Sequence, residues 1–590
     1  MKIFDRGNSI YSNKMKQFFL SAIPSTFLLG FLATSATAAT LKLEPIGTFS
    51  TGVFDDEAAF ISAFDPFTSN LFVTNRSNQS VDILNLSNPM NPFKIGEVII
   101  PDLNPDLFGN VLHVRSFSYD TQSLFAVSVE NVNRQDNGSL LFFNADGSLF
   151  NGSLDNSSVM VGPLPDMFAF TPDGKKILTA NEGEANDEYT IDPEGSVSFI
   201  DLDNLFAGLA PTETKIGLTD FNEGGSKADK LIGEGIRIFG PNATVAEDLE
   251  PEYITISEDG KKAWVSFQEN NAIGLLDLET REFTEIVGLG YKDHSLPGNG
   301  LDVSDRDDGI NIKNWPIFGM YQPDEIASYT ANGKTYIVIA NEGSGREFDG
   351  YNEEVRAEDL TLDPDAFPED ILDEDKLGRL TVTNATGDTD GDGEFEELYT
   401  FGGRSFSILD ENGNIIFDSG DQFEKITAKL FPEYFNADNS ENNFDNRSDN
   451  KGPEPEGVTI GQLGGRTYAF IGLERIGGIM TYDITDPYNP SFVSYDNNRD
   501  FSVEFDEDEE GEPAPTPEQL AAVGDLGPEG LLFIDAKNSP NGKTLLIATN
   551  EVSGSTTIYS VERVPEPGTI LGLLATSALG GWMLKRKRSN

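Results

Sequence analysis

Short apolar runs rich in β-branched and aromatic residues recur from residue 57 to residue 563, each bounded by turn residues. In residues 166–202, an apolar run at about 167–171 is followed by the turn Pro172–Lys175, a second run at 177–181 and a third at 196–201. Such runs separated by tight turns are typical of antiparallel hairpins, and no helical period of about 3.6 residues is present. The pattern predicts an all-β fold made of repeated hairpins.

The repeated unit consists of an acid or turn, two strands joined by a turn, a short loop and a third strand. Its starts are found at Glu57, about Val111, Asp166, Glu252, Glu325, Glu456 and Glu529. Units of about 40 residues made of short antiparallel strands indicate a β-propeller. The starts predict seven blades, with six or eight as alternatives.

The last unit supplies only three strands, ending near residues 555–561, and residues 41–49 form a strand without a unit of its own. We expect this N-terminal strand to complete the last blade and close the ring, because closure removes an exposed sheet edge. Long loops separate the blades at 218–248, 291–320, 346–378, 421–452 and 504–519.

Both ends of the chain have the features of targeting segments. Lys14 and Lys16 precede an apolar run, and small residues at 36–38 offer a cleavage site, so residues 1–38 are predicted to be a signal peptide. Residues 564–590 contain Pro565, Glu566 and Pro567, an apolar stretch of about 17 residues long enough for a transmembrane helix, and a basic end. Residues 39–563 then form the propeller domain.

This C-terminal end resembles the PEP-CTERM sorting signal in all three of its parts. The resemblance implies that an exosortase-type enzyme is a partner and removes the tail. The protein would then be secreted through the inner membrane, anchored transiently by its C-terminal helix, and released to the cell surface or extracellular matrix.

Charge excludes one class of partner. The chain has 99 acidic and 41 basic residues, a formal net charge of −58, which argues against nucleic acid because phosphate binding needs a basic surface. It has no cysteine and two histidines, so thiol chemistry and a histidine-rich metal site are also disfavoured. With 38% hydrophobic residues, a large core can still form.

Acids recur where the first strand of a unit begins and where the second strand ends. In a propeller these two places lie on one face, around the mouth of the central channel. The acids we predict as metal ligands there are Glu57, Asp166, Glu182, Glu252, Glu325, Glu342, Glu456, Glu529 and Glu551, and Asp324, Glu454 and Glu474 share the same positions. Crowded carboxylates repel unless a cation such as Ca²⁺ binds them. The alternative is that they cap turns on a solvated rim.

A second acidic cluster is local. Asp388, Asp390 and Asp392 alternate and are followed by Gly393, as in the first half of an EF-hand loop. Position 12 is Tyr399, however, so we expect a calcium-ordered loop between strands. Its closing acid would be Glu394, Glu396 or Glu397.

The usual catalytic motifs, a nucleophile elbow and a phosphate-binding loop, are missing from the sequence. His294 is a weak candidate for an acid or base, the alternative being an ordinary loop histidine. Arg346 and Arg404 flank acidic segments and could hold a phosphate on bound metal. More often such arginines pair with neighbouring carboxylates.

Several long phrases resemble the choice-of-anchor I family. They include residues 164–202, 288–295, 323–347, 388–408 and 452–487. The resemblance implies an extracellular propeller whose members carry interchangeable sorting tails and are often labelled alkaline phosphatase-like. The acids before strands also resemble, more loosely, those of calcium-dependent propeller phytases.

The sequence predicts two alternative functions. The first is a secreted calcium-binding propeller in the cell envelope or matrix that binds a partner such as an extracellular polysaccharide. The alternative is a metal-dependent phosphomonoesterase acting on a phosphoester through carboxylate-bound Ca²⁺. The sequence leaves catalysis open.

Overall fold

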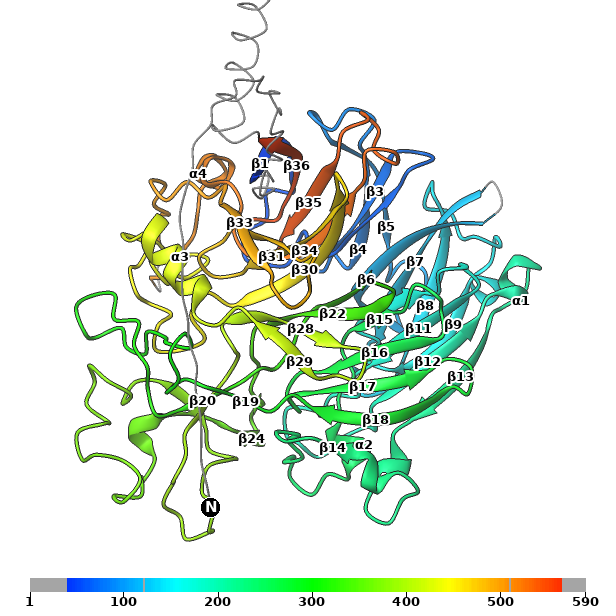
Figure 1. Ribbon diagram of the computed structural model, residues 1–590. Coiled ribbons are helices and arrows are strands. Elements are labelled where there is room, and N and C mark those ends of the chain that lie inside the picture. Colours follow the sequence, from blue (N-terminus) through cyan, green and yellow to red (C-terminus); the bar gives the residue numbers. More distant parts are fainter. Residues whose placement is uncertain (1–39, 120–121, 509–510, 565–590) are drawn as a thin grey trace, which may run out of the picture. The chain divides into compact units, whose positions relative to one another are not determined.

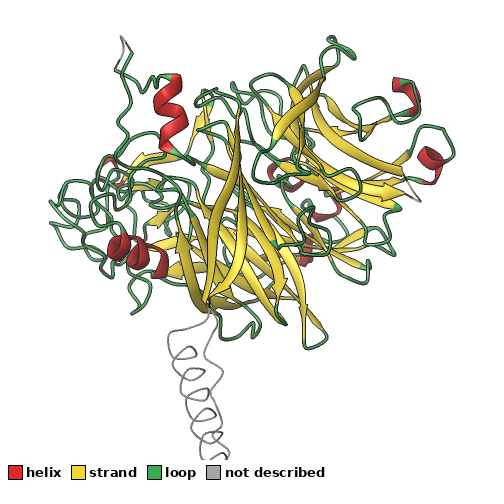
Figure 2. Ribbon diagram, turned by 90° about the horizontal axis from the view of Figure 1, so that it is seen from above, coloured by secondary structure: helices red, strands yellow, loops and turns green. Residues whose placement is uncertain are grey.

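The computed structural model describes residues 40–119, 122–508 and 511–564 (Figure 1). These residues form an all-β fold with many antiparallel sheets, in which strands and loops greatly exceed helices (Figure 2). The predicted signal peptide at 1–38 and the sorting motif Pro565, Glu566 and Pro567 with its apolar tail lie outside the described residues. Within them, no helix is long and apolar enough to cross a membrane.

Seven sheets of the described residues contain four antiparallel strands in the pattern that the repeats predict. The first is β2 (Ser62–Asp65), β3 (Asn70–Asn75), β4 (Ser80–Asn85) and β5 (Phe93–Ile99). The second is β6 (Phe108–Tyr119), β7 (Gln122–Asn131), β8 (Asn137–Asn144) and β9 (Ser158–Pro163). The third is β10 (Phe168–Phe170), β11 (Lys176–Asn181), β12 (Ser196–Asp201) and β13 (Thr212–Gly217). The fourth is β15 (Ile254–Ile256), β16 (Lys262–Phe267), β17 (Ala272–Asp277) and β18 (Glu282–Gly288), extended by β14 (Leu231–Ile232).

The fifth sheet is β21 (Ile326–Ala331), β22 (Lys334–Asn341), β28 (Ser405–Asp410) and β29 (Ile415–Asp418). The sixth is β30 (Pro455–Leu463), β31 (Arg466–Leu473), β32 (Ile479–Asp483) and β33 (Ser491–Asp496). The seventh is β34 (Pro528–Ile534), β35 (Leu545–Asn550), β36 (Ser555–Val564) and β1 (Thr40–Ser50). Each expected unit start lies in the first strand of one of these sheets or a few residues before it.

The N-terminal strand lies in the last sheet, as the sequence predicts. β1 pairs antiparallel with β36 from Thr40 opposite Val564 to Ser50 opposite Ser555. Leu41 and Leu43 of β1 are buried with Tyr468, Phe470 and Tyr559. The first and last described strands of the chain are therefore held together by a backbone ladder and by a shared core.

Successive sheets pack against one another through separate apolar cores. Phe72 of the first sheet packs with Phe125 of the second, and Leu124 of the second with Phe168 of the third. The same holds for each following pair of sheets, through the cores around Phe199 and Phe267, Trp264 and Ile337, Phe406 and Tyr482, and Phe470 and Leu546. A further core joins Ile547 of the seventh sheet to Leu71 of the first, so the red end of the chain lies beside the blue beginning (Figure 1).

The long loops contain more structure than we expected. Segments 291–320 and 346–400 contribute β19 (Tyr291–Asp293), β20 (Phe318–Met320), β25 (Glu354–Arg356), β26 (Thr381–Thr383) and β27 (Tyr399–Thr400) to one additional sheet. β23 (Glu347–Phe348) and β24 (Tyr351–Asn352) form a small hairpin. The reason is that these loops bring their own apolar residues, including Val303, Trp315 and Leu380, which form a separate core.

The helices of the described residues are short and lie in the connections between strands. They are α1 (Asp203–Phe206), α2 (Val245–Asp248), α3 (Gln422–Leu430) and α4 (Pro517–Val523), with 3₁₀ turns at Leu154–Asn156, Thr219–Phe221, Ala228–Lys230 and Ala357–Asp359. The loops expected at 218–248, 421–452 and 504–519 thus contain α2, α3 and the start of α4.

Replacing Leu43 by Ala tests the packing of the N-terminal strand. Leu43 is 3% exposed, and removing a buried leucine side chain typically costs about 2–5 kcal/mol of unfolding free energy. We expect a loss in that range in urea denaturation. The neighbouring Lys42→Ala, on the exposed face of the same strand, should change the unfolding free energy by less than about 0.5 kcal/mol. Equal effects of the two substitutions would contradict the observed strand register.

Candidate metal-binding site

Acids from several strand entries surround a cavity of about 220 Å³. Its lining includes Asp166, Glu182, Glu252, Asp324, Glu325 and Glu529, together with Arg76, His113, Arg134, Tyr253 and Gln268. Asp166, Glu252 and Glu325 lie one or two residues before the first strands of three sheets, and Glu182 follows the end of a second strand. The expectation that these two kinds of position converge is therefore confirmed.

Burial dominates the electrostatics of this cavity. It raises the pKa of Glu182, Glu252, Asp324 and Glu529 well above the ordinary range, and in each case neighbouring carboxylates raise the pKa further. The pKa of Glu325 is raised to about 7, again mainly by burial. Its two oxygens accept hydrogen bonds from Tyr253 Oη at 2.7 Å and from the Val458 N–H at 2.6 Å.

Asp324, which lines the cavity, belongs to a group of acids that are close enough to share an ion. Single oxygens of Asp324, Glu342 and Glu456 lie within 4.8 Å of one another. Glu342 is oriented by Gln268 Nε2, which donates at 2.8 Å, and by the ammonium of Lys451 at 2.7 Å. Glu456 Oε2 is buried and has no hydrogen-bond partner among the described residues. A set of carboxylate oxygens with an unsatisfied acceptor suits a hard cation such as Ca²⁺.

A second group is already neutralised by the protein. Glu342, Glu454 and Glu474 also have oxygens within 4.8 Å. Glu454, however, is paired with Lys451 at 2.9 Å, Arg475 at 3.0 Å and Arg447 at 2.7 Å. Although burial alone would raise it, the pKa of Glu454 is held well below its usual range by these three cations. This group needs no metal.

The remaining predicted ligands at the mouth do not form such a group. Within the described ranges, Glu57, Asp166, Glu182, Glu252, Glu325, Glu529 and Glu551 belong to no set of three acids with oxygens within 4.8 Å. Glu57 pairs with Arg76 at 3.1 Å, and Arg76 also lies 4.0 Å from Asp166. Burial raises the pKa of Glu551 to about 7.

The acids of the predicted calcium loop also lie close together. Asp388, Asp390, Asp392 and Glu396 each bring an oxygen within 4.8 Å of the others. Asp388 accepts the backbone N–H groups of Gly391 at 2.7 Å and Gly393 at 3.0 Å. Of the three acids considered for closing the loop, Glu396 is the one that joins, while Glu397 accepts a hydrogen bond from Tyr399 Oη at 2.5 Å.

The weak catalytic candidates do not line the cavity. His294 is buried, its Nδ1 lies 2.7 Å from the Asn299 carbonyl, and burial lowers its pKa to about 3. Arg346 is paired with Asp248 and, at 2.7 Å, with Glu250. Arg404 donates to the Asp302 carbonyl at 2.7 Å and to Glu424 at 2.6 Å. Both arginines fit the alternative that they pair with neighbouring carboxylates.

No sequence pattern indicates which basic residues pair with these acids. Arg76, Arg134, Lys451 and Arg475 neutralise particular acids there, and Arg134 pairs with Glu184 at 2.9 Å. Asp324 occupies the expected position at the start of a first strand, although it is not one of the predicted metal ligands. Its signal was present, because it precedes Glu325 at the start of β21 in the same way that Glu454 precedes Pro455 and Glu456.

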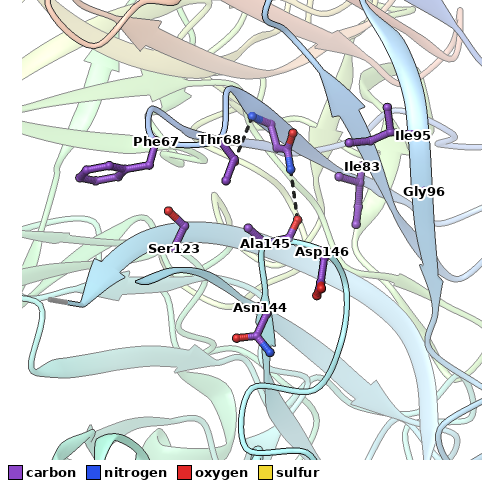
Figure 3. A pocket seen from close by; sticks show the side chains of 10 residues that line it. Phe67, Thr68, Ile83, Ile95, Gly96, Ser123, Asn144, Ala145 and Asp146 are labelled. Atoms are coloured by element: carbon purple, nitrogen blue, oxygen red, sulfur yellow. Dashed lines mark hydrogen bonds between the residues drawn. The ribbon is translucent and has the colours of Figure 1, made fainter. Parts of the chain in front are cut away.

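A larger pocket of about 610 Å³ lies between the first two sheets (Figure 3). It is lined by Phe67, Ile83 and Ile95 and by polar groups that bond locally, such as Asn70 Nδ2, which donates to the Ala145 carbonyl at 3.1 Å. None of the predicted ligands is found in its lining.

Comparison with known proteins identifies a family. The model of the choice-of-anchor I domain matches residues 60–487, well over half of the chain. A mesenchyme-specific cell surface glycoprotein of Strongylocentrotus purpuratus is 29% identical over 282 residues, which are 42% of this chain and 36% of that protein. Gigasin-3a of Magallana gigas is 28% identical over 199 residues, 32% of this chain and 66% of the relative. The chain thus spans less than two thirds of either relative.

Among solved structures, hydrazine synthase of Kuenenia stuttgartiensis is similar with a TM-score of 0.42 and 14% identity, covering 88% of this chain and 100% of that one. The Cps50 (Swd1) β-propeller domain of Myceliophteria thermophila has a TM-score of 0.39 and 9% identity, covering 88% of this chain and 100% of its own.

The buried carboxyl of Glu325 gives a pH prediction for the metal-free protein. Its folded pKa of about 7 exceeds the unfolded value of about 4.3. The proton therefore stabilises the fold fully below the unfolded pKa, and that stability is lost as the pH rises through about 7. In EGTA, wild type should lose up to about 3 kcal/mol more unfolding free energy between pH 4.5 and 8 than Glu325→Gln does. Parallel pH profiles of the two proteins in urea denaturation would contradict this.

Proposed function

The chain belongs to the choice-of-anchor I family, and from this membership and the acidic cavity we propose that it is a secreted, calcium-binding seven-bladed β-propeller that acts as a binding module. Membership in the family indicates a surface-anchored or secreted protein. The blade number, the bound ion and the binding role are our proposal.

The propeller is supported by the order of contacts among the first strands. β2 contacts β6, β6 contacts β10, and the series continues through β15, β21, β30 and β34, which contacts β2 again. The apolar cores between successive sheets follow the same cycle, from Phe72 with Phe125 to Ile547 with Leu71. In such an arrangement the first strands line a central channel, and the acidic cavity lies at its mouth.

The surface location is supported by one relative and by the composition. The Strongylocentrotus purpuratus protein is named a cell surface glycoprotein, and a net charge of −58 favours a solvated extracellular surface. We propose that the PEP-CTERM-like tail, with Pro565, Glu566 and Pro567, directs sorting by an exosortase-type enzyme after transit through the inner membrane. The mature protein would act at the cell surface or in the extracellular matrix, with a polysaccharide as partner.

The trio of Asp324, Glu342 and Glu456 is the observation that carries the calcium proposal. Of its three carboxylates, only Glu342 forms an ion pair with a lysine or arginine among the described residues. Burial and mutual repulsion raise the pKa of Asp324 and Glu456 well above the ordinary range. A divalent cation would remove this repulsion, with backbone carbonyls and water completing the 6–8 oxygens that Ca²⁺ prefers. The loop of Asp388, Asp390, Asp392 and Glu396 would hold a second ion.

The alternative, a metal-dependent phosphomonoesterase, needs two ions about 3.5–4 Å apart. The two groups that share Glu342 are adjacent as such an arrangement requires. The second group, however, is filled by Lys451, Arg447 and Arg475. A single ion at the mouth favours binding over phosphoryl chemistry.

Calcium binding is tested by thermal unfolding of the purified protein with Ca²⁺ or EGTA. Saturation to 100 times Kd should add about 2.7 kcal/mol per site to the unfolding free energy. Glu456→Gln should reduce this gain by the contribution of one site. Glu562→Gln, an exposed acid in β36, should retain it in full. A melting temperature that does not change between Ca²⁺ and EGTA would overturn the proposal.

Hydrolysis of p-nitrophenyl phosphate separates the two functions. We expect no turnover above background with Ca²⁺, Mg²⁺, Mn²⁺ or Zn²⁺, because one ion without a partner ion or nucleophile does not supply two-metal chemistry. Turnover that requires metal and is lost in Glu456→Gln, but not in Glu562→Gln, would establish the esterase instead.

A further inference from the structure

A third group of acids lies away from the strand entries, where two inserted loops meet. Residues 294–317 connect β19 to β20, and an isolated bridge between Leu301 and Lys313 folds them into a hairpin. Residues 431–454 connect α3 to β30. Asp302 and Asp307 come from the first loop and Asp445 from the second, and one oxygen of each lies within 4.8 Å of the others.

Hydrogen bonds fix the orientation of all three carboxylates. The backbone N–H of Asn311 donates to Asp302 Oδ2 at 2.5 Å, and Asn311 Nδ2 donates to Asp307 Oδ2 at 2.6 Å. Ser448 Oγ donates to Asp445 Oδ1 at 2.5 Å. The group is therefore preorganised, which lowers the cost of ordering ligands around an ion.

An unsatisfied oxygen is buried within the group. Asp302 is 0% exposed, and its Oδ1 has no hydrogen-bond partner among the described residues. A buried carboxylate oxygen without a donor or cation is costly, by about the desolvation penalty of a charged group. Asp302 Oδ2 is already used by Asn311, so Oδ1 is the atom available to a ligand.

No ion pair neutralises the negative charge of the group. None of the three aspartates forms an ion pair within the described ranges, and Asp445 is 3% exposed. Arg404, which acts on Asp302 electrostatically, donates to Glu424, to the Asp302 carbonyl at 2.7 Å and to the Ser448 carbonyl at 2.9 Å. Its guanidinium is thus occupied by neighbours of the group.

We propose that Asp302, Asp307 and Asp445 form a buried binding site for one hard divalent cation, with Ca²⁺ the expected ion, which ties the two inserted loops together. The donor atoms are all carboxylate oxygens, the ligands that Ca²⁺ takes in proteins. Softer metals such as Zn²⁺ prefer nitrogen and sulfur, which this group does not provide.

Protonation of the aspartates competes with cation binding as a way to neutralise the group. Burial, with help from Glu424 and other nearby acids, raises the pKa of Asp302 to about 7 and that of Asp445 to about 8. A bound cation has to displace these protons, because a carboxylate coordinates a metal in its ionised form. Binding would clamp the hairpin of residues 301–313 to loop 431–454 and fix the carbonyls that receive Arg404.

The test counts bound calcium in the full-length chain after equilibrium dialysis. Asp302→Asn with Asp445→Asn should bind one ion fewer than wild type. Asp308→Asn is the matched control, because Asp308 is exposed, lies outside the group and has a φ of 60° that Asn tolerates. It should bind as many ions as wild type. This site is distinguished from the channel mouth because Glu456→Gln should remove a different ion, additively.

Limited proteolysis supplies an independent readout. In wild type and in Asp308→Asn, Ca²⁺ should protect residues 301–313 and 431–454 from cleavage relative to EGTA, and the double variant should lose this protection. If the double variant does not fold, Asp307→Asn alone decides, with calcium affinity at this site at least about tenfold weaker. An unchanged calcium count in a folded variant, or equal cleavage of wild type in Ca²⁺ and EGTA, would overturn the proposal.

Discussion

The accumulation of buried carboxylates at the entries of the first strands is the constraint on which the rest of the structure depends. Several first-strand entries and a second-strand end bring acids to one cavity, and burial raises the pKa of Glu182, Glu252 and Asp324 well above the ordinary range. Charges of one sign in a low-dielectric cavity must be offset by protons, by basic residues or by metal ions. The fold uses different solutions at different points of the mouth.

How each carboxylate is neutralised depends on which loop lies beside it. The loop before β30 carries Arg447 and Lys451, and together with Arg475 these residues neutralise Glu454. Asp324 and Glu456 lie in the same region but receive no such partner. Permanent charges of the protein thus neutralise Glu454, whereas Asp324 and Glu456 have no ion-pair partner among the described residues. This asymmetry is the reason that we propose one ion position beside the neutralised group.

Much of the fold could be predicted from the sequence, because hairpins leave local signals. The seven strand entries and the loop at Asp388 follow from short-range patterns of apolar, turn and acidic residues. The place of the N-terminal strand follows instead from the strand that the last unit lacks. The pairing of Lys451 with Glu342, across 109 positions, has no such signal. No short-range pattern indicates that Asp302 and Asp445 lie close together either. The additional sheet was missed because its strands, such as Tyr399–Thr400, are very short.

The neutral amides at the second-strand ends show why position alone does not assign a ligand. Asn181 donates to Ser196 and Ser198 at 3.2 and 3.1 Å, and Asn341 donates to Ser405 and Ser407 at 3.0 and 2.8 Å. These amides tie the second strand to the third, although they precede acids in the same phrase, such as Glu182 and Glu342. One residue of the repeated phrase therefore maintains the sheet and the next supplies charge to the cavity. The amide thus contributes to strand pairing, whereas the acid affects stability through the protons or ions that neutralise it.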